Sequence, residues 1–189
     1  MGKIEIVVKE NEEEILPFIS INGEREDTSL IVRLAGNNAR VFIAGIFLGS
    51  EQNASVFNTT VIHQNTNTYS RTDLRGVFLN HASFTNDAMI RIEKGSKQAD
   101  GFFTSKILLF DDAKGRSVPS LEIDENEVKA GHASTIGRPN AEQLFYMQSR
   151  GLSQKDAERL LIAGFFGPLY KYFSTLQQKL VQKEVHKIL

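Results

Sequence analysis

The stretch EVKAGHASTIGRPNAEQLFYMQSRGL, residues 127–152, contains the point at which one kind of sequence gives way to another. Before it, short runs of Val, Ile, Phe and Thr alternate with Asn, Gly, Ser and Asp, which is typical of β-strands joined by turns. After Gly-Arg-Pro at 137–139, apolar residues recur at helical spacing. The sequence therefore predicts a β body over residues 1–137 and a helical subdomain over residues 138–189.

The β body contains Asn-rich turns, GNN (36–38) and QNTNT (64–68), which favour a coil of short rungs because Asn tolerates left-handed backbone angles. Val-Phe recurs at spacings of 15 and 21 residues, which is too irregular to set a repeat period. A sandwich, a barrel and a β-helix all remain compatible with this pattern. The β-rich runs are IEIVV (4–8), SLIVRL (29–34), RVFIAGIFL (40–48), SVFNTTVIH (55–63), RGVFLNHASF (75–84), AMIRIE (88–93), KILLF (106–110) and PSLEI (119–123).

Three helices are expected in the second part. The first has Pro139 in its opening turn and runs to about Arg150, where Gly151 stops it. The second begins at Ser153, and Gly167-Pro168 separates it from the third. The apolar face of the second is expected to be Ala157, Leu160, Leu161, Gly164 and Phe165, and that of the third Leu169, Tyr172, Phe173, Leu176, Leu180 and Val181. Helices this short cannot bury every aromatic residue among themselves, so some are expected to pack on the β body or on another protein.

Composition limits the possible functions. The chain has 189 residues, a net charge of −1 and no cysteine. The near-neutral net charge does not favour binding to nucleic acid or anionic lipid. The absence of cysteine excludes disulfides, thiolate metal sites and a cysteine nucleophile. The longest apolar run, residues 41–48, is too short to span a bilayer, and no signal peptide is recognised, so the cytoplasm is the expected compartment.

Charge is distributed unevenly along the chain. Residues 1–30 carry three basic and eight acidic side chains, whereas residues 139–189 carry seven basic and four acidic ones. The two ends are therefore expected to present different surfaces.

No catalytic set stands out among the residues. His63, His81 and His186 are read as hydrogen-bonded or solvated histidines, since no close metal-binding pair is present. Asp111 and Asp112 are adjacent and are expected to lie in a turn rather than to converge as an acid–base pair. His132 differs, because small neighbours leave its imidazole uncovered.

The region around His132 resembles the C-terminal core of the SufB/SufD family, the scaffold proteins of the SUF system of iron–sulfur cluster assembly. The resemblance covers roughly residues 55–167 and more weakly residues 30–54 and the tail. It is carried by PSLEI (119–123), the Val128-Lys129 pair, His132 with Thr135 and Gly137-Arg138, LFY (144–146), SRG (149–151), Gly164-Phe165 and, upstream, VIHQNTNTYSRTDLRGV (61–77), KQADGF (97–102) and KILLFDDA (106–113).

This resemblance implies a right-handed parallel β-helix followed by short helices. It also implies that the helices dock onto a SufC-like ABC ATPase, while the β-helix pairs with a SufB-like scaffold or a second copy. The contact residues expected for the ATPase are Phe145, Tyr146, Arg150, Leu152, Leu161 and Phe165.

The chain departs from the family pattern at two positions. Ala99 stands where the SufB branch has its sulfur-accepting cysteine, and Ala130 stands where many SufD-type members have one. Gly131 and Ala133 replace the acidic neighbours that flank the histidine in SufB-type members, so the chain is closer to SufD. The N-terminal helical region of typical members is absent from this sequence, so a minimal form is expected.

The resulting expectation is a non-enzymatic SufD-like scaffold with no stably bound cofactor. Without a thiolate the chain cannot accept persulfide sulfur, but neutral His132 can supply one iron ligand to a transient iron–sulfur cluster whose other ligands come from a cysteine-bearing partner. Two alternatives stay open. One is a structural homodimer without cluster chemistry, and the other is a β-helix enzyme acting on polysaccharide. No partner among nucleic acids or membranes is expected.

Overall fold

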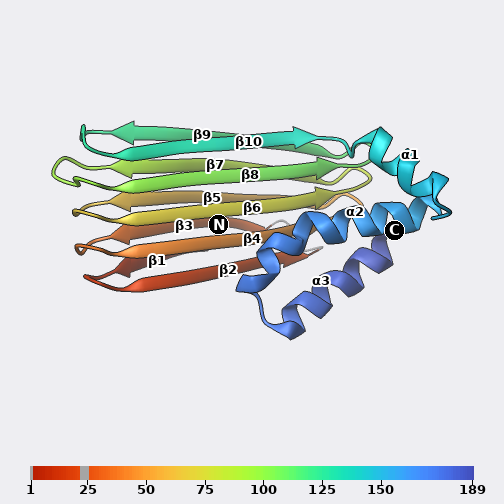
Figure 1. Ribbon diagram of the computed structural model, residues 1–189, viewed down its shortest axis with the longest axis horizontal. Helices are drawn as coiled ribbons and strands as arrows, with labels where there is room; N and C mark the ends of the chain where they lie inside the picture. Colours follow the sequence, from red (N-terminus) through yellow and green to blue (C-terminus); the bar gives the residue numbers. More distant parts are fainter. Residues whose placement is uncertain (1, 22–25) are drawn as a thin grey trace.

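Ten strands precede all the helices in the computed structural model, which describes residues 2–21 and 26–189 (Figure 1). Most of them hold nine or ten residues, and the corners between them are short. The strands are β1 (Gly2–Val8), β2 (Glu13–Ile21), β3 (Glu26–Leu34), β4 (Arg40–Gly49), β5 (Ala54–His63), β6 (Tyr69–Phe78), β7 (Ser83–Ile92), β8 (Asp100–Leu109), β9 (Lys114–Ile123) and β10 (Lys129–Gly137).

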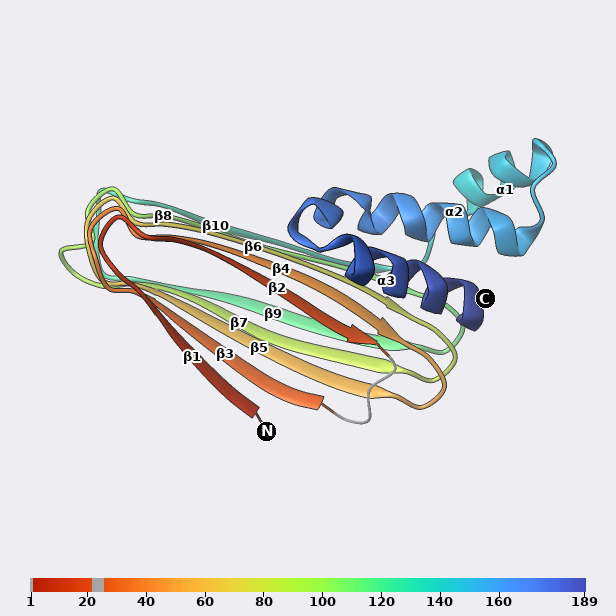
Figure 2. The ribbon, with the colours of Figure 1, turned by 90° about the horizontal axis from the view of Figure 1, so that it is seen from below.

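The chain coils between two parallel sheets. Odd-numbered strands form one sheet in the order β1-β3-β5-β7-β9, and even-numbered strands form the other in the order β10-β8-β6-β4-β2. Arg40 pairs with Tyr69 and Tyr69 with Asp100, so neighbouring strands are 29 and 31 residues apart in sequence. Two strands make one turn of a solenoid of about five turns, whose interior lies between the sheets (Figure 2). The prediction of a parallel β-helix followed by helices is confirmed.

Left-handed residues stack at both corners of the solenoid. One row is Asn11, Asn38, Asn67 and Gln98, and the other is Glu51, Asn80 and Asp111, all with φ between 50° and 60°. In the first row the Asn38 amide donates to Asn11 Oδ1 at 2.8 Å and the Asn67 amide donates to Asn38 Oδ1 at 2.6 Å. Asn tolerates this backbone region and its amide bonds to the same group one turn away, so the expectations drawn from the Asn-rich turns and from Asp111 are confirmed.

An aromatic column fills part of the interior. The ring centroid of Phe84 lies 4.9 Å from that of Phe47 and 5.3 Å from that of Phe78, and Phe47 lies 5.0 Å from Phe57. These rings are buried and belong to β4, β5, β6 and β7. Consecutive turns are therefore joined by side-chain stacking as well as by backbone hydrogen bonds.

The helices are α1 (Ala141–Ser149), α2 (Gln154–Phe166), the 3₁₀ helix η1 (Gly167–Tyr172) and α3 (Thr175–Ile188). α2, η1 and α3 pack on the outer face of the even-numbered sheet, whereas α1 lies beyond the ends of the strands (Figures 1 and 2). Asn140, Ser153 and Ser174 cap the three α-helices, and Gly151 with φ of 95° follows the end of α1. The start at Ser153 and the stop at Gly151 were predicted, but Pro139 precedes the cap of α1 instead of lying in its first turn.

A second apolar core joins the helices to the solenoid. Ile162, Phe166 and Leu169 pack with Ala44 and Ile46 of β4, and other members of both parts extend this cluster. The buried Arg75 on β6 adds a polar anchor, because its guanidinium donates to the carbonyl of Phe165 and pairs with Asp73 at 3.1 Å. A cation suits this position because the carbonyl lies in the last turn of α2.

The faces predicted for the second and third helices were partly wrong. In α2 the buried side chains are Ala157, Ile162 and Phe166, whereas Leu160 is 56% exposed. In α3 they are Val181 and Val185, whereas Leu176 and Leu180 are exposed. Both helices carry more than one apolar stripe, so helical spacing alone could not identify the stripe that faces the sheet.

Two strands were missed and one predicted run crosses a corner. β2 contains Pro17 and two glutamates, and β10 consists largely of small residues, so neither has a typical strand composition. Residues 75–84 were read as one run, but they include the corner between β6 and β7. None of the helices in the described part of the chain has the length and apolarity needed to cross a bilayer.

Candidate functional site

His132 lies on β10, the terminal strand of the even-numbered sheet. It is in register with Phe103 of β8, which is buried in the solenoid interior. Paired residues on neighbouring strands point to the same side of a sheet, so His132 continues the interior-facing row. Its neighbour Gly131 is on the opposite side, since a Cβ there would meet the outward ring of Phe102 at 2.8 Å. The imidazole is therefore at the open end of the interior, where it is exposed.

Apolar side chains surround this open end. Leu121 and Ile123 on β9 pair with the buried Ile90 and Ile92 and so also face the interior direction, yet both are exposed, as is Ile136 on β10. We call Leu121, Ile123, His132 and Ile136 the last-turn surface. Terminal strands also leave backbone groups unpaired, so this surface offers both apolar area and strand edges to another chain.

His132 has no metal-binding companions among the residues that the structure describes. Within residues 2–21 and 26–189, no three His, Cys, Asp or Glu side chains are placed to hold a metal ion together. A single imidazole supplies one ligand, so an iron atom at this position would need the remaining ligands from elsewhere.

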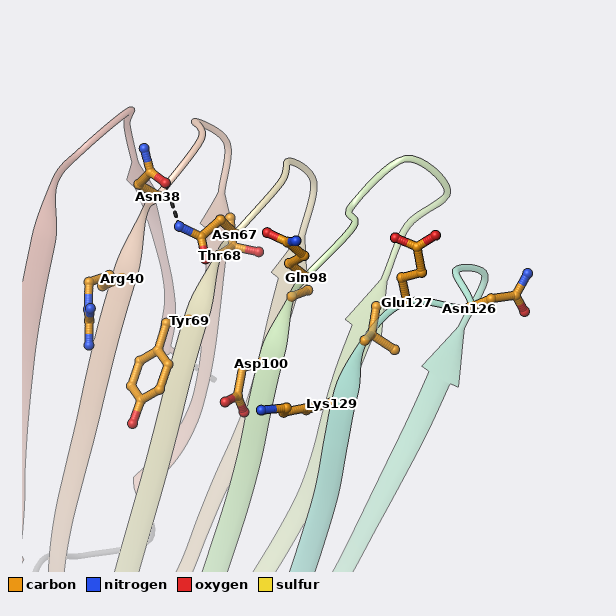
Figure 3. Close-up of a pocket in the computed structure, with 12 residues that line it drawn as sticks. Asn38, Arg40, Asn67, Thr68, Tyr69, Gln98, Asp100, Asn126, Glu127 and Lys129 are labelled. Atoms are coloured by element: carbon orange, nitrogen blue, oxygen red, sulfur yellow. Dashed lines mark hydrogen bonds between the residues drawn. The ribbon is translucent and has the colours of Figure 1, made fainter.

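Ala99 and Ala130, at which the resemblance implies cysteines in other members, lie in different surroundings. Ala99 is buried at the corner before β8, and Ala130 is half-buried on β10 against the interior core. Ala99 also lines a pocket of about 600 Å³ at this corner (Figure 3). At Ala99 only a methyl group faces this pocket.

Polar side chains in the corner pocket largely bind one another. Arg40 and Arg71 lie over the ring of Tyr69, with the guanidinium carbons 4.6 and 4.1 Å from its centroid. Arg71 also pairs with Asp100 at 2.8 Å and Arg40 with Glu13 at 3.1 Å. Figure 3 shows Arg40, Tyr69 and Asp100 of this set on neighbouring strands of successive turns. Their arrangement stabilises the corner and does not form a ligand set.

His63 is buried inside the solenoid and is structural. Thr68 Oγ1 donates to the carbonyl of Asn65, so it accepts from His63 Nδ1 at 2.8 Å, which leaves Nε2 to accept from Ser70 Oγ at 2.9 Å. Gly101 gives the ring room, because a Cβ there would lie 3.0 Å from Nε2. Burial lowers the pKa of His63 to about 4, with a smaller opposing effect from Asp100 and a smaller lowering effect from Arg71.

This buried histidine makes stability depend on pH. The unfolded chain takes up a proton near pH 6.5 and the folded chain only near pH 4, so the contribution of His63 is complete above pH 6.5 and is lost as pH falls to about 4. We expect the free energy of unfolding to fall by about 3 kcal/mol more for the wild type than for His63→Gln over this window. Urea denaturation of both proteins at several pH values measures the difference, and parallel pH curves would contradict it.

The other two histidines are on the surface. His81 Nδ1 is 3.9 Å from Asp112 at the opposite corner, and His186 Nδ1 contacts the carbonyl of Gln182 at 2.9 Å. Both are exposed, in agreement with their reading as solvated or hydrogen-bonded residues.

An apolar groove of about 470 Å³ lies between α1 and α2. Two expected contact residues, Tyr146 and Leu161, line it, and the Arg150 guanidinium carbon lies 5.3 Å from the Tyr146 ring centroid. The expected contacts did not include the other five lining residues, Glu142, Gln143, Met147, Leu160 and Gly164. Leu160 was predicted on the same apolar face as Leu161, and only the packing of α2 shows that both line the groove. We call this the helix groove.

The remaining expected contacts lie outside the helix groove. Phe145 and Leu152 are exposed, so they remain available to another chain. Phe165 is half-buried against the second core, and its ring centroid is 5.6 Å from the Arg75 guanidinium carbon. The structure thus brings Tyr146, Arg150 and Leu161 together and places Phe165 at the junction with the solenoid.

Comparison with known proteins relates the chain to one family. Residues 3–165 match the model of the SufBD core domain of SUF system FeS cluster assembly. The chain is 34% identical to the iron–sulfur cluster assembly protein SufD of Bacillus subtilis over 125 residues, which are 66% of this chain and 29% of that protein. It is 28% identical over 183 residues to an iron–sulfur cluster assembly SufBD family protein of Mycobacterium leprae, covering 90% of this chain and 46% of the relative. SufD of Escherichia coli is 36% identical over 84 residues, 44% of this chain and 20% of that protein. The chain thus spans less than half the length of these relatives.

Proposed function

This chain belongs to the SufB/SufD family of iron–sulfur cluster assembly proteins, and from that premise we propose that it is a non-catalytic, SufD-like scaffold subunit. In this role the last-turn surface pairs with a SufB-like scaffold or a like chain, and the helix groove receives a SufC-type ABC ATPase. The observation that carries the proposal is the position of His132 on an exposed terminal strand, within an apolar end that a second chain can cover.

Pairing at the last turn is supported by what that surface offers. Leu121, Ile123 and Ile136 would leave water on contact, and the unpaired edges of β9 and β10 can accept strands from another chain. The same contact would bring groups of the partner next to His132, which has no metal-binding companions within residues 2–21 and 26–189.

The chemistry proposed for His132 is limited to ligand supply. A neutral imidazole can bind iron through one nitrogen, and thiolates of a cysteine-bearing partner would complete the coordination of a cluster that is assembled and passed on. The chain itself contains no thiol, so sulfur would have to be accepted by the partner. The cluster is thus cargo of the complex.

Docking of the ATPase is supported by the composition and rigidity of the helix groove. Tyr146, Met147, Leu160 and Leu161 line it, both of its helices are capped, and α2 is anchored on the solenoid. Exposed aromatic and aliphatic side chains around a concave site are the usual anchors of a protein interface. The shared core means that a pull on α2 would be transmitted to β4 and β6 of the solenoid.

The first test is light scattering after chromatography of the chain, alone and with the SufC-like ATPase of its organism, with and without ATP. A stable complex with raised ATPase turnover is expected. A chain that never binds the ATPase and remains a homodimer would instead indicate the structural alternative. The geometry favours the polysaccharide-enzyme alternative less, since Arg40 at the corner pocket pairs with Glu13 and Asp100 pairs with Arg71.

Replacing His132 separates cluster chemistry from pairing. We expect His132→Ala to leave binding of the scaffold partner and the ATPase unchanged and to lower the affinity of the complex for iron at least about tenfold, as loss of a metal-site group does. Iron retained after reconstitution with Fe²⁺ and sulfide, followed by desalting, measures this effect. His81→Ala is the matched control, because His81 is also exposed but is at a corner. Equal iron retention by both variants would overturn the ligand role.

A further inference from the structure

A pocket of about 420 Å³ lies where η1 meets the outer face of the even-numbered sheet. Side chains of β4, β6 and β8 line its floor, and residues of η1 line one wall. In Figure 1 the helices cover only the part of this sheet toward the ends of its strands, and the starts of the strands are not covered by helices. β4, β6 and β8 are inner strands of the sheet, so the pocket is away from both open ends of the solenoid. We call it the sheet pocket.

Aromatic rings form much of the lining. The ring centroid of Phe42 on β4 lies 5.5 Å from that of Tyr69 on β6 and 6.4 Å from that of Tyr172 on η1. The planes of the Phe42 and Tyr172 rings differ by only 26°, so these two rings are nearly parallel. Phe102 on β8 also lines the pocket and is 38% exposed. Flat apolar faces from three strands and one helix therefore border one cavity, and they suit a ligand that is itself a flat ring.

The charged groups at the sheet pocket do not cancel completely. Arg71 pairs with Asp100 at 2.8 Å. Asp73 accepts two hydrogen bonds from the buried Arg75, at 3.3 and 3.1 Å. Lys171 is exposed and has no carboxylate partner within the part of the chain that the structure describes, and its ammonium nitrogen lies 4.8 Å from the centroid of the Tyr172 ring. One uncompensated positive charge thus lies beside the aromatic lining, where it attracts anions.

Hydroxyl groups at the sheet pocket are also available to a ligand. Tyr69, Thr104 and Tyr172 line the pocket, and their hydroxyl groups make no hydrogen bond within residues 2–21 and 26–189. A hydroxyl group can donate one hydrogen bond and accept others, so each can bind an oxygen atom of a ligand. The volume of the pocket lies within the range of small-molecule sites, about 300–1,000 Å³. Apolar planes, hydrogen-bonding groups and one free cation are therefore combined in a cavity of suitable size.

We propose that the sheet pocket binds a small aromatic anion, that is, a planar ring system that carries one carboxylate or phosphate group. The ring would lie against Phe42, Phe102 and Tyr172, where it leaves water and gains aromatic contacts. The acidic group would lie at the rim next to Lys171, where a charge-assisted hydrogen bond forms without burial of an unpaired charge.

Other ligands fit this arrangement less well. A cation would be repelled by Lys171, and the nearby carboxylates of Asp73 and Asp100 are already paired with arginines. An aliphatic anion would reach the same ammonium group but would gain less from flat aromatic walls. The combination of several rings with a single free cation therefore favours an aromatic anion.

Titration of the ¹⁵N-labelled chain with naphthoate and with naphthyl phosphate tests the proposal. We expect the backbone amide resonances of Thr104 and Lys171 to shift in both titrations, with a dissociation constant of about 1 mM or lower. Octanoate lacks the ring and naphthamide lacks the charge, so both should bind more weakly than naphthoate. Binding of only one of the two anions would support the proposal and identify the acidic group.

Two variants assign the contacts. Lys171→Met should raise the dissociation constant of naphthoate about threefold or more and leave that of naphthamide unchanged, because it removes only the charge. Phe102→Leu should raise both constants about threefold or more, because it removes a ring and no charge. Lys179→Met is the matched control, because Lys179 is an exposed lysine of α3 outside the sheet pocket. Circular dichroism checks that each variant is folded.

Several results would overturn the proposal. They are the absence of shifts at about 10 mM of either anion, shifts confined to the helix groove, equal affinity for octanoate and naphthoate, and an unchanged affinity of Lys171→Met for naphthoate. Failure here does not affect the scaffold proposal, because the sheet pocket and the helix groove share no lining residue and His132 is outside both.

Discussion

Leu160→Asp is expected to abolish detectable binding of a SufC-type ATPase to this chain. Leu160 lines the helix groove and is largely exposed in the free chain, so the substitution costs little folding stability. In the complex its side chain would be enclosed with Tyr146 and Met147, where an unpaired carboxylate costs several kcal/mol. An interface anchor of this kind is typically worth at least about 2 kcal/mol even as an alanine change, so affinity should fall more than about 100-fold.

Leu176→Asp is the matched control for this experiment. It makes the same chemical change on an exposed leucine of α3 outside the helix groove. Calorimetric titration of the ATPase into each variant should therefore show binding by Leu176→Asp and none by Leu160→Asp. If both variants bind with wild-type affinity, the ATPase does not use the helix groove and the docking proposal fails.

Phe84→Ala is expected to lower the free energy of unfolding by about 3–5 kcal/mol, the range for deletion of a buried aromatic side chain. Phe84 is buried on β7 and stacks with Phe47 and Phe78 of the opposite sheet. Its removal leaves a cavity between the sheets in the middle of the column, and the neighbouring turns hold that space open.

Urea denaturation followed by circular dichroism measures this loss. Phe145→Ala is the control, because Phe145 is 73% exposed and its removal should change stability by less than about 0.5 kcal/mol. A similar small effect for both residues would mean that the aromatic column contributes little and that the corner hydrogen bonds dominate.

The residues at the corners of the solenoid predict the fold more clearly than the residues of its strands do. Asn38 and Asn67 lie in the turns that favoured a coil of rungs, and they are 29 residues apart, close to the offset between paired strands. The Val-Phe pairs gave no period because Phe42 faces outward while Phe57 and Phe78 are buried. Comparison of turn residues would therefore have given the length of one turn.

The candidate site was accessible from sequence only in part. His132 was identified by its small neighbours and by family resemblance, but its place on a terminal strand depends on where the stack of turns ends. The expected contact residues identify the helix groove only in part. Tyr146 and Leu161 line it, whereas Phe165 lies beside Arg75 at the junction with the solenoid. Helical spacing describes which residues share a face, and tertiary packing alone decides which of two apolar faces is buried.

The stacked corners also allow the number of turns in the solenoid to change during evolution. The two ends of the solenoid are separated by whole turns, each of which advances the stack by one interstrand distance of about 4.8 Å. Inserting or deleting a unit of about 29 residues, from one left-handed asparagine to the next, would preserve register, corner ladder and both ends. Evolution could thus change the distance between the two ends of the solenoid in fixed increments without changing either end.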